Sequence, residues 1–154
     1  MDSLAILSDD KRYFPPTHEA LIEPNGLLAI GGDLTTERLL NAYKLGIFPW
    51  YESPNQILWW TPNPRSVLFL NELHISRSMR KILERKKYRV VFDKDFSKVV
   101  EQCALTRKSY GGTWLNREMQ QAYIDLHNIG VAHSISIYDL NGALQGGLYG
   151  IALG

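Results

Sequence analysis

Tryptophans set among prolines are the first residues in this chain whose types could do chemistry. Trp50, Trp59 and Trp60 lie in a proline-rich stretch, residues 46–65. Prolines disfavour helix and interior strand, which predicts a rigid loop with one short strand at 57–60. An indole ring can stack on a nucleobase or wall an apolar pocket, and the alternative is that these rings fill the core. Neighbouring side chains of a strand point to opposite faces, so at most one of Trp59 and Trp60 should line a given pocket.

Residues 77–89 carry a second candidate, a cluster of basic side chains. The spacing of three or four residues places part of this cluster on one helical face, opposite an apolar stripe: Arg77, Arg80, Lys81 and Arg85. Such a row suits a phosphate backbone. The alternative is an ordinary solvated helix face, but such faces usually mix both signs, and Glu84 is the one acid here.

Glycine pairs mark two further places where a backbone could approach a ligand. Gly111-Gly112 precedes Trp114, and Asn116 is placed to cap the helix that follows. The alternative is a plain loop whose tryptophan fills the core. Gly146-Gly147 interrupts a strand pattern, which indicates a bulge or a close approach.

Other catalytic patterns are absent from the sequence. It holds no P-loop and no dinucleotide-binding glycine motif, and its histidines lack metal-ligand spacing. Cys103, the single cysteine, lies on an apolar helical stripe and is predicted to be a buried small hydrophobe. With one cysteine, no disulfide can form within the chain.

Composition indicates a folded chain. Among 154 residues, 45% are hydrophobic and 21% are charged, with a net charge of +1. This balance argues against global disorder. The N-terminus reads as neither signal peptide nor anchor, and no apolar run is long enough to cross a bilayer. A soluble cytoplasmic protein is the expectation.

The elements that would position these side chains follow from hydrophobic periodicity. A helix is predicted from a cap at Thr35 to Gly46. Beyond it, the pattern predicts strand, helix, strand, two helices and a hairpin, with strands at 66–70 (SVLFL) and 88–92 (YRVVF) and the hairpin turn at 140–142. This order predicts an α+β fold.

Several strings in the chain resemble one protein family, the bacterial leucyl/phenylalanyl-tRNA–protein transferases. The resemblance covers nearly the whole chain from about Phe14, and GIFPW together with LWW-x-P-x-PR is specific to the family. The strings occur in the family's order: EPNGLLAIGGDL, LGIFPWY, ILWWTPNPRSVL, HISRSMRK, GTWLN, LHNIGVAHSISIY and GGLYGIALG.

The resemblance implies a small N-terminal domain at 1–63 and the first part of an acetyltransferase-like domain at 64–154. It implies transfer of leucine or phenylalanine from Leu-tRNA or Phe-tRNA to the N-terminal Lys or Arg of a protein, which marks that protein for degradation, with no metal or organic cofactor. The counterparts of Trp50 and Trp114 hold the aminoacyl-tRNA 3′ end, and that of Leu148 helps form the amino-acid pocket. The basic residues of the HISRSMRK helix meet the tRNA.

The resemblance also implies that the family's sequence continues past the counterpart of Gly154, and that the catalytic aspartate and glutamine lie there. Two alternatives to an active transferase stay open. One is a chain that only binds the aminoacyl-tRNA end. The other is an acetyltransferase-like enzyme for small molecules, which the order of elements permits but for which the sequence offers no pyrophosphate-binding glycine loop.

Overall fold

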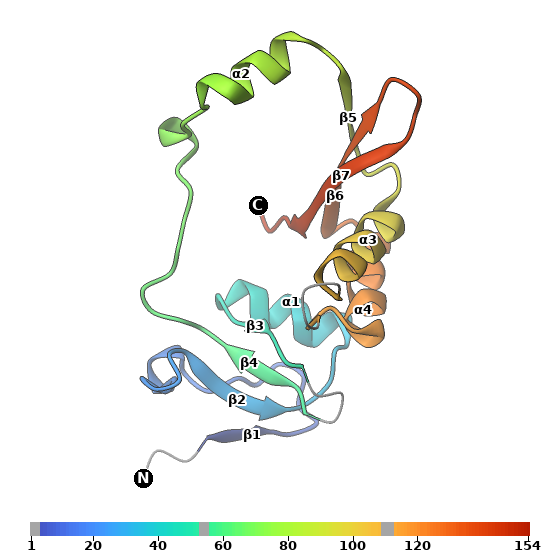
Figure 1. The fold of residues 1–154 in the computed structure, drawn as a ribbon. Coiled ribbons are helices and arrows are strands. Elements are labelled where there is room, and N and C mark those ends of the chain that lie inside the picture. Colours follow the sequence, from blue (N-terminus) through green and yellow to red (C-terminus); the bar gives the residue numbers. More distant parts are fainter. Residues whose placement is uncertain (1–3, 53–55, 109–112) are drawn as a thin grey trace.

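The computed structural model describes residues 4–52, 56–108 and 113–154. Over these residues the chain has the predicted α+β fold, with two sheets (Figure 1). The strands and α-helices are, in order, β1 (Ala5–Leu7), β2 (Leu27–Gly31), α1 (Thr36–Lys44), β3 (Phe48–Pro49), β4 (Leu58–Trp60), α2 (Arg77–Glu84), β5 (Tyr88–Phe92), α3 (Phe96–Lys108), α4 (Arg117–Asn128), β6 (Ala132–Asp139) and β7 (Leu144–Ile151). Single 3-10 turns lie at Thr17–Glu19 and Leu70–Glu72.

The first sheet has the strand order β1-β2-β4-β3. Strand β1 runs parallel to β2, while β4 pairs antiparallel with both β2 and β3. Leu28 and Ala29 of β2 and Trp59 of β4 are buried in its core. The fully buried Arg38 of α1 donates from Nη2 to the Ser8 carbonyl at 2.7 Å, so the helix is tied to the end of β1.

Helix α1 begins and ends where the sequence predicts. Thr35 is its N-cap residue in an extended conformation, although its hydroxyl donates to Asp33 rather than bonding the helix backbone. Gly46 follows the C-cap with φ of +76°, a conformation that glycine adopts without steric cost. Helix α1 packs beside β3.

The second sheet has the order β5-β6-β7, and both of its pairings are antiparallel. Alternate residues of β6 are buried on the face covered by α3 and α4: Ala132, Ser134, Ser136 and Tyr138. A Cβ at Gly147 of β7 would stand 2.8 Å from Val99 Cγ1, so the glycine permits α3 to pack closely on β7. The register also shifts between Ile137 and Tyr138, which places a bulge beside Gly146, as the glycine pair indicated.

The two sheets share one continuous core. It includes Leu39 of α1, Trp59 of β4 and Leu126 of α4. Next to this core the hydroxyls of Tyr43 and Tyr123 lie 2.6 Å apart and join α1 to α4. Burial raises the pKa of Tyr43 to about 12, which keeps its hydroxyl protonated as a hydrogen-bonding group. The predicted boundary between residues 63 and 64 stays a prediction.

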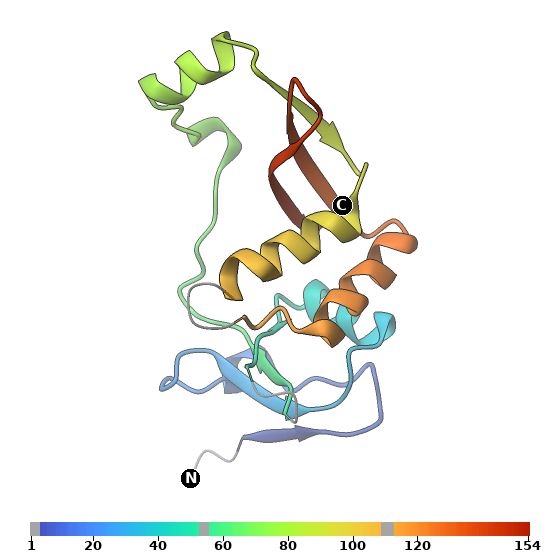
Figure 2. The ribbon, with the colours of Figure 1, turned by 45° about the vertical axis from the view of Figure 1, so that its right-hand side comes forward.

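Residues 66–87, which we call the arm, leave this core. Figures 1 and 2 show an extended segment that leads from β4 to α2, which stands apart from the other helices. No residue of α2 is buried. The predicted strand at 66–70 is wrong: Ser66–Phe69 have no regular structure, and Leu70 opens a 3-10 turn. A strand needs a hydrogen-bonded neighbour, and none of the described strands lies beside this segment.

Candidate functional site

The tryptophans of the proline-rich stretch differ in burial: Trp59 lies in the core, Trp60 is half-buried and Trp50 is exposed. Trp59 is fully buried, and its Nε1 donates to the Gly31 carbonyl at 2.8 Å. Trp60, the next residue in β4, points to the other side and donates from Nε1 to the Trp50 carbonyl at 2.7 Å. The expectation of opposite faces is therefore confirmed, and the core alternative holds for Trp59.

Trp50 follows β3, and its exposed ring lies against the half-buried ring of Trp60. Its side chain is 46% exposed, and the two ring centroids lie 5.5 Å apart. Arg65 brings positive charge to β3. Its guanidinium stands 4.7 Å over the ring of Phe48 and donates to the Gly46 carbonyl. An exposed indole can stack on a base, and a guanidinium can attract a phosphate.

Trp114 lies two residues before Asn116, the N-cap of α4. The ring is half-buried and meets Tyr123 edge-on at 6.5 Å, and Tyr123 in turn meets Tyr149 of β7 at 5.1 Å. Asn116 caps α4 as predicted, accepting from Met119 N at 2.9 Å. Trp50 and Trp114, both described, make no ring contact with each other. The Gly111-Gly112 pair lies outside the described residues.

Leu148 lines an apolar cavity on the face of the second sheet that α3 and α4 leave open. The cavity has a volume of about 230 Å³ and is walled by Phe92, Ile135, Leu148 and residues around His133. Ile135 pairs with Leu148 on one side and with Phe92 on the other, so the three side chains share one face. Such a lining suits an aliphatic or aromatic side chain.

A histidine–aspartate pair stands at the rim of this cavity. His133 Nδ1 lies 2.7 Å from Asp93 Oδ2, and Asp93 Oδ1 accepts from Ser134 N. The hydrogen bond to Asp93 raises the pKa of His133, and the same bond lowers the pKa of Asp93. Sequence reasoning missed this pair because the residues are 40 positions apart and meet only through the pairing of β5 with β6.

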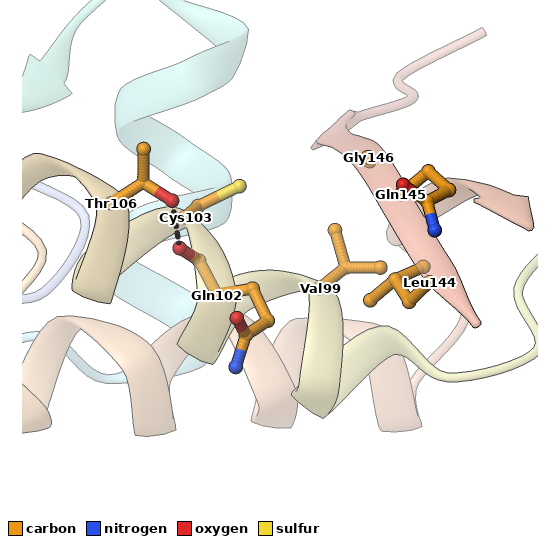
Figure 3. Close-up of a pocket in the computed structure, with 8 residues that line it drawn as sticks. Val99, Gln102, Cys103, Thr106, Leu144, Gln145 and Gly146 are labelled. Carbon is orange, nitrogen blue, oxygen red and sulfur yellow. Dashed lines mark hydrogen bonds between the residues drawn. The ribbon is translucent and has the colours of Figure 1, made fainter.

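Another cavity, of about 430 Å³, is lined by residues of α3 and of the first half of β7 (Figure 3). Val99, Leu144 and Gly146 give it apolar walls, and Gln102 and Gln145 bring amide groups. Cys103 lines this cavity and packs against the core half-buried, so it is less buried than predicted. The helical stripe was identified correctly, but the glycines of β7 leave space opposite it.

The basic residues of the predicted helix lie on the arm. Arg77, Arg80 and Lys81 belong to α2, Arg85 is its C-cap, and all four side chains are exposed. Ser76 begins the helix by accepting from Met79 N at 3.2 Å. Figure 1 shows this helix far from β3, which Trp50 follows, so the structure does not bring the basic stripe and the tryptophans into one pocket.

The described residues hold no group of three or more His, Cys, Asp or Glu side chains arranged to bind a metal ion. None of the helices among them has the length and apolar content that a bilayer crossing requires.

Two family models match most of this chain. Residues 67–154 match the family model of the leucyl/phenylalanyl-tRNA protein transferase, and residues 32–63 match that of its N-terminal domain. The chain belongs to this transferase family.

Individual transferases of the family confirm the assignment along the whole chain. Proteins named leucyl/phenylalanyl-tRNA–protein transferase from Azotobacter vinelandii and from Pseudomonas fluorescens SBW25 are each 52% identical to it over 151 residues. One from Stutzerimonas stutzeri is 54% identical. Each match covers 98% of this chain but 66% of the relative, so the chain spans about two thirds of the length of these relatives.

Proposed function

We propose that this chain belongs to a transferase that moves leucine or phenylalanine from aminoacyl-tRNA to the N-terminal Lys or Arg of a protein, in the bacterial cytoplasm. The added residue marks the protein for degradation. One observation carries the proposal: 98% of the chain matches bacterial proteins named for leucyl/phenylalanyl transfer, at 52–54% identity.

The aromatic surfaces would hold the end of the tRNA. In the proposed complex Trp50 and Trp114 contact the terminal nucleotide, and the amino-acid side chain enters the cavity lined by Leu148. Three features support this: the exposure of Trp50, the contact from Trp114 through Tyr123 to Tyr149 beside Leu148, and the apolar lining of that cavity. An apolar pocket separates similar apolar side chains only modestly, which fits the use of both leucine and phenylalanine.

Helix α2 would contact the tRNA backbone. Arg77, Arg80, Lys81 and Arg85 are exposed, and none of them takes part in a salt bridge found among the described residues. Their charge is therefore available to phosphates. Each phosphate that a cation neutralises releases counterions, so binding should weaken as salt rises.

The reaction would be aminolysis of the ester that joins the amino acid to the tRNA. The α-amine of the acceptor has an ordinary pKa of about 7.7–8.0, so part of it is neutral near pH 7. Its nitrogen attacks the ester carbonyl carbon, the bond to the ribose oxygen breaks, and a proton from the attacking amine passes to that oxygen. The enzyme must hold both reactants in attack geometry and stabilise the oxyanion. We place the groups for this step in the part of the family's chain beyond Gly154.

A second candidate function is binding of the aminoacyl-tRNA end without transfer. The features that would hold the tRNA, Trp50, Trp114 and the basic stripe, lie in this chain, whereas the catalytic groups are placed beyond it. Both functions require aminoacyl-tRNA binding, and only transfer separates them.

Binding of Leu-tRNA across a salt series tests the shared part. For single strands, log affinity should fall with log salt by about 0.7 for each phosphate contact, and by about 0.9 for duplex. Arg77→Ala and Lys81→Ala should each make this slope shallower by the value of one phosphate contact. Lys98→Ala, at an exposed position of α3, should leave the slope unchanged. Trp50→Ala should weaken binding by about 1–3 kcal/mol, the usual value of one stacked base. A response that is flat with salt would reject the proposed tRNA site.

Transfer of radiolabelled leucine to a protein that begins with arginine separates the two candidates. The assay should compare this chain with the same chain extended by the last third of the Azotobacter vinelandii relative. Transfer by either form supports the transferase. Binding by both forms without transfer by either supports the binding function.

A further inference from the structure

The His133–Asp93 pair is a titratable pair that the reaction described above leaves unused. His133 Nδ1 lies 2.7 Å from Asp93 Oδ2, and Asp93 Oδ1 accepts from the amide of Ser134, also at 2.7 Å. The carboxylate therefore bonds both to the imidazole and to the backbone beside it, which fixes the orientation of the ring. A histidine held by a carboxylate is an arrangement that proton-transferring sites use, but on a surface it can also be a simple ion pair. The surroundings of the pair separate these two roles.

His133 stands on the open face of the second sheet, the face that α3 and α4 do not cover. These helices bury the alternate residues Ala132 and Ser134, so His133 and Ile135 share the opposite face. Ile135 pairs with Leu148 of β7, and His133 itself lines the cavity that Leu148 lines. The imidazole is therefore about 7 Å along the strand from the residue that pairs with Leu148. This places it beside the cavity proposed to hold the amino acid.

The backbone opposite His133 leaves space for a substrate. Its partner across the pairing of β6 with β7 is Gly150, and a Cβ built there would meet nothing within 4 Å. The cavity has a volume of about 230 Å³, and the side chain of His133 is 44% exposed. Because Nδ1 is engaged by Asp93, Nε2 is the nitrogen that would exchange a proton with a substrate. A leucine side chain in the cavity would bring its ester group to the rim where this imidazole stands.

Asp93 dominates the electrostatic surroundings of His133. The hydrogen bond to its carboxylate raises the pKa of His133, and the charge of that carboxylate and the Gly130 carbonyl add to the rise. On α4, His127 acts on the pair through its charge on Asp93, and on β7 the facing residue is the uncharged Gly150. The raised pKa of the imidazole lies closer to that of an ordinary α-amine, about 7.7–8.0. An imidazole matched in this way can accept and return a proton near neutral pH.

We propose that His133, held by Asp93, carries the proton of the transfer reaction. Its Nε2 takes a proton from the α-nitrogen of the acceptor as that nitrogen bonds to the ester carbonyl carbon. The imidazolium gives this proton to the ribose oxygen as the bond to that oxygen breaks, so the neutral imidazole is regenerated. His133 is then a catalytic residue, and Asp93 is a positioning residue. The proposal rests on the proposed transfer, in which the groups placed beyond Gly154 hold the reactants and stabilise the oxyanion.

Removing the imidazole tests the proton step in the transfer assay above, with the chain extended by the last third of the Azotobacter vinelandii relative. His133→Ala should lower kcat about 10²–10⁴-fold, the usual contribution of general acid–base catalysis. The KM for the acceptor protein and the Kd for Leu-tRNA should stay unchanged. His18→Ala, at an exposed histidine near the N-terminus, is the matched control and should keep full activity. Added imidazole should restore part of the activity of His133→Ala, because it can occupy the space beside Gly150, and should not affect the control.

The pH profile of kcat separates a proton carrier from a structural residue. In the unsubstituted extended chain kcat should rise with pH through the raised pKa of His133, because only the neutral imidazole accepts a proton. Asp93→Asn should move this limb to lower pH, toward 6.5, since it removes the bond that raises the pKa. Asp9→Asn, at an exposed aspartate, should leave the limb in place. The limb that belongs to the acceptor's amine should be the same in every variant.

The outcomes distinguish this proposal from the proposed function. Full activity of His133→Ala, with transfer by the unsubstituted extended chain, would overturn the role of His133 and leave the transferase standing. A loss that imidazole does not rescue, together with an unmoved limb in Asp93→Asn, would also overturn it, because His133 would then act only through the structure. Binding of Leu-tRNA without transfer by the unsubstituted extended chain would overturn the transferase, and the role of His133 with it.

Discussion

The N-terminal sheet with α1 and the arm contain similar side chains in opposite environments. Leu39 of α1 is fully buried and Trp59 of β4 is sealed in the core, whereas Leu70 and Phe69 of the arm are mostly exposed. The first region closes on itself because β1, β2, β3 and β4 pair with one another and α1 covers them. The arm has no such neighbours. The difference shows that burial here depends on pairing partners and not on how apolar a segment is.

Truncating one leucine in each region should give the largest difference in the free energy of unfolding between the two regions. Leu39→Ala should lower the free energy of unfolding by about 2–5 kcal/mol, because it removes buried methyl groups and leaves a cavity. Leu70→Ala should change it by less than about 0.5 kcal/mol, since the side chain is already in water. Urea unfolding followed by circular dichroism measures both. Similar losses for the two variants would mean that the arm is packed in solution.

The packed and open sides of the second sheet should differ in the same way, at a smaller scale. Gly147→Ala should cost about 1–3 kcal/mol, because its Cβ would stand 2.8 Å from Val99 Cγ1. Gly150→Ala should be close to neutral, since a Cβ there meets nothing within 4 Å. The same urea measurement applies. Adding Val99→Ala to Gly147→Ala should recover part of the loss, and no recovery would argue that the clash is not the cause.

The His133–Asp93 pair lies at the cavity on the open face, and breaking it should have the smallest effect of the three changes. Asp93→Asn should return the pKa of His133 toward its ordinary value of 6.5, because the hydrogen bond to Asp93 is what raises it. An NMR titration of the imidazole protons measures the shift. Asp9→Asn, at an exposed aspartate near the N-terminus, is the control and should leave the titration unchanged. An unshifted His133 in the Asp93→Asn variant would show that the pair does not form.

The same pair gives a direction to stability with pH. Because the pKa of His133 is raised in the fold, its contribution is complete below pH 6.5 and is lost as pH rises through the raised value. Because the pKa of Asp93 is lowered, its contribution is present above pH 3.8 and is lost as pH falls through the lowered value. The pair therefore stabilises the fold most between about pH 3.8 and 6.5.

Local elements were predictable where local chemistry decides them. Thr35, Gly46 and Asn116 placed helix ends correctly, and the hairpin of β6 and β7 follows from its alternating pattern and the turn with Gly142 at φ of +83°. The opposite faces of Trp59 and Trp60 follow from the period of a strand. The strand at 66–70 failed because pairing requires a second segment that local pattern does not supply. The burial of Cys103 was overestimated because the glycines that leave a cavity opposite it stand more than forty residues away in the sequence.

By itself the sequence determined the family, the α+β fold class and the residues proposed to meet the tRNA, because motifs, composition and short-range periodicity are properties of neighbouring residues. Tertiary structure alone decided that Trp59 is core while Trp50 stays exposed, that Asp93 reaches His133, and that one face of the second sheet is closed and the other open. Each of these depends on which distant segments meet. The arm stays exposed because none of the described strands pairs with it.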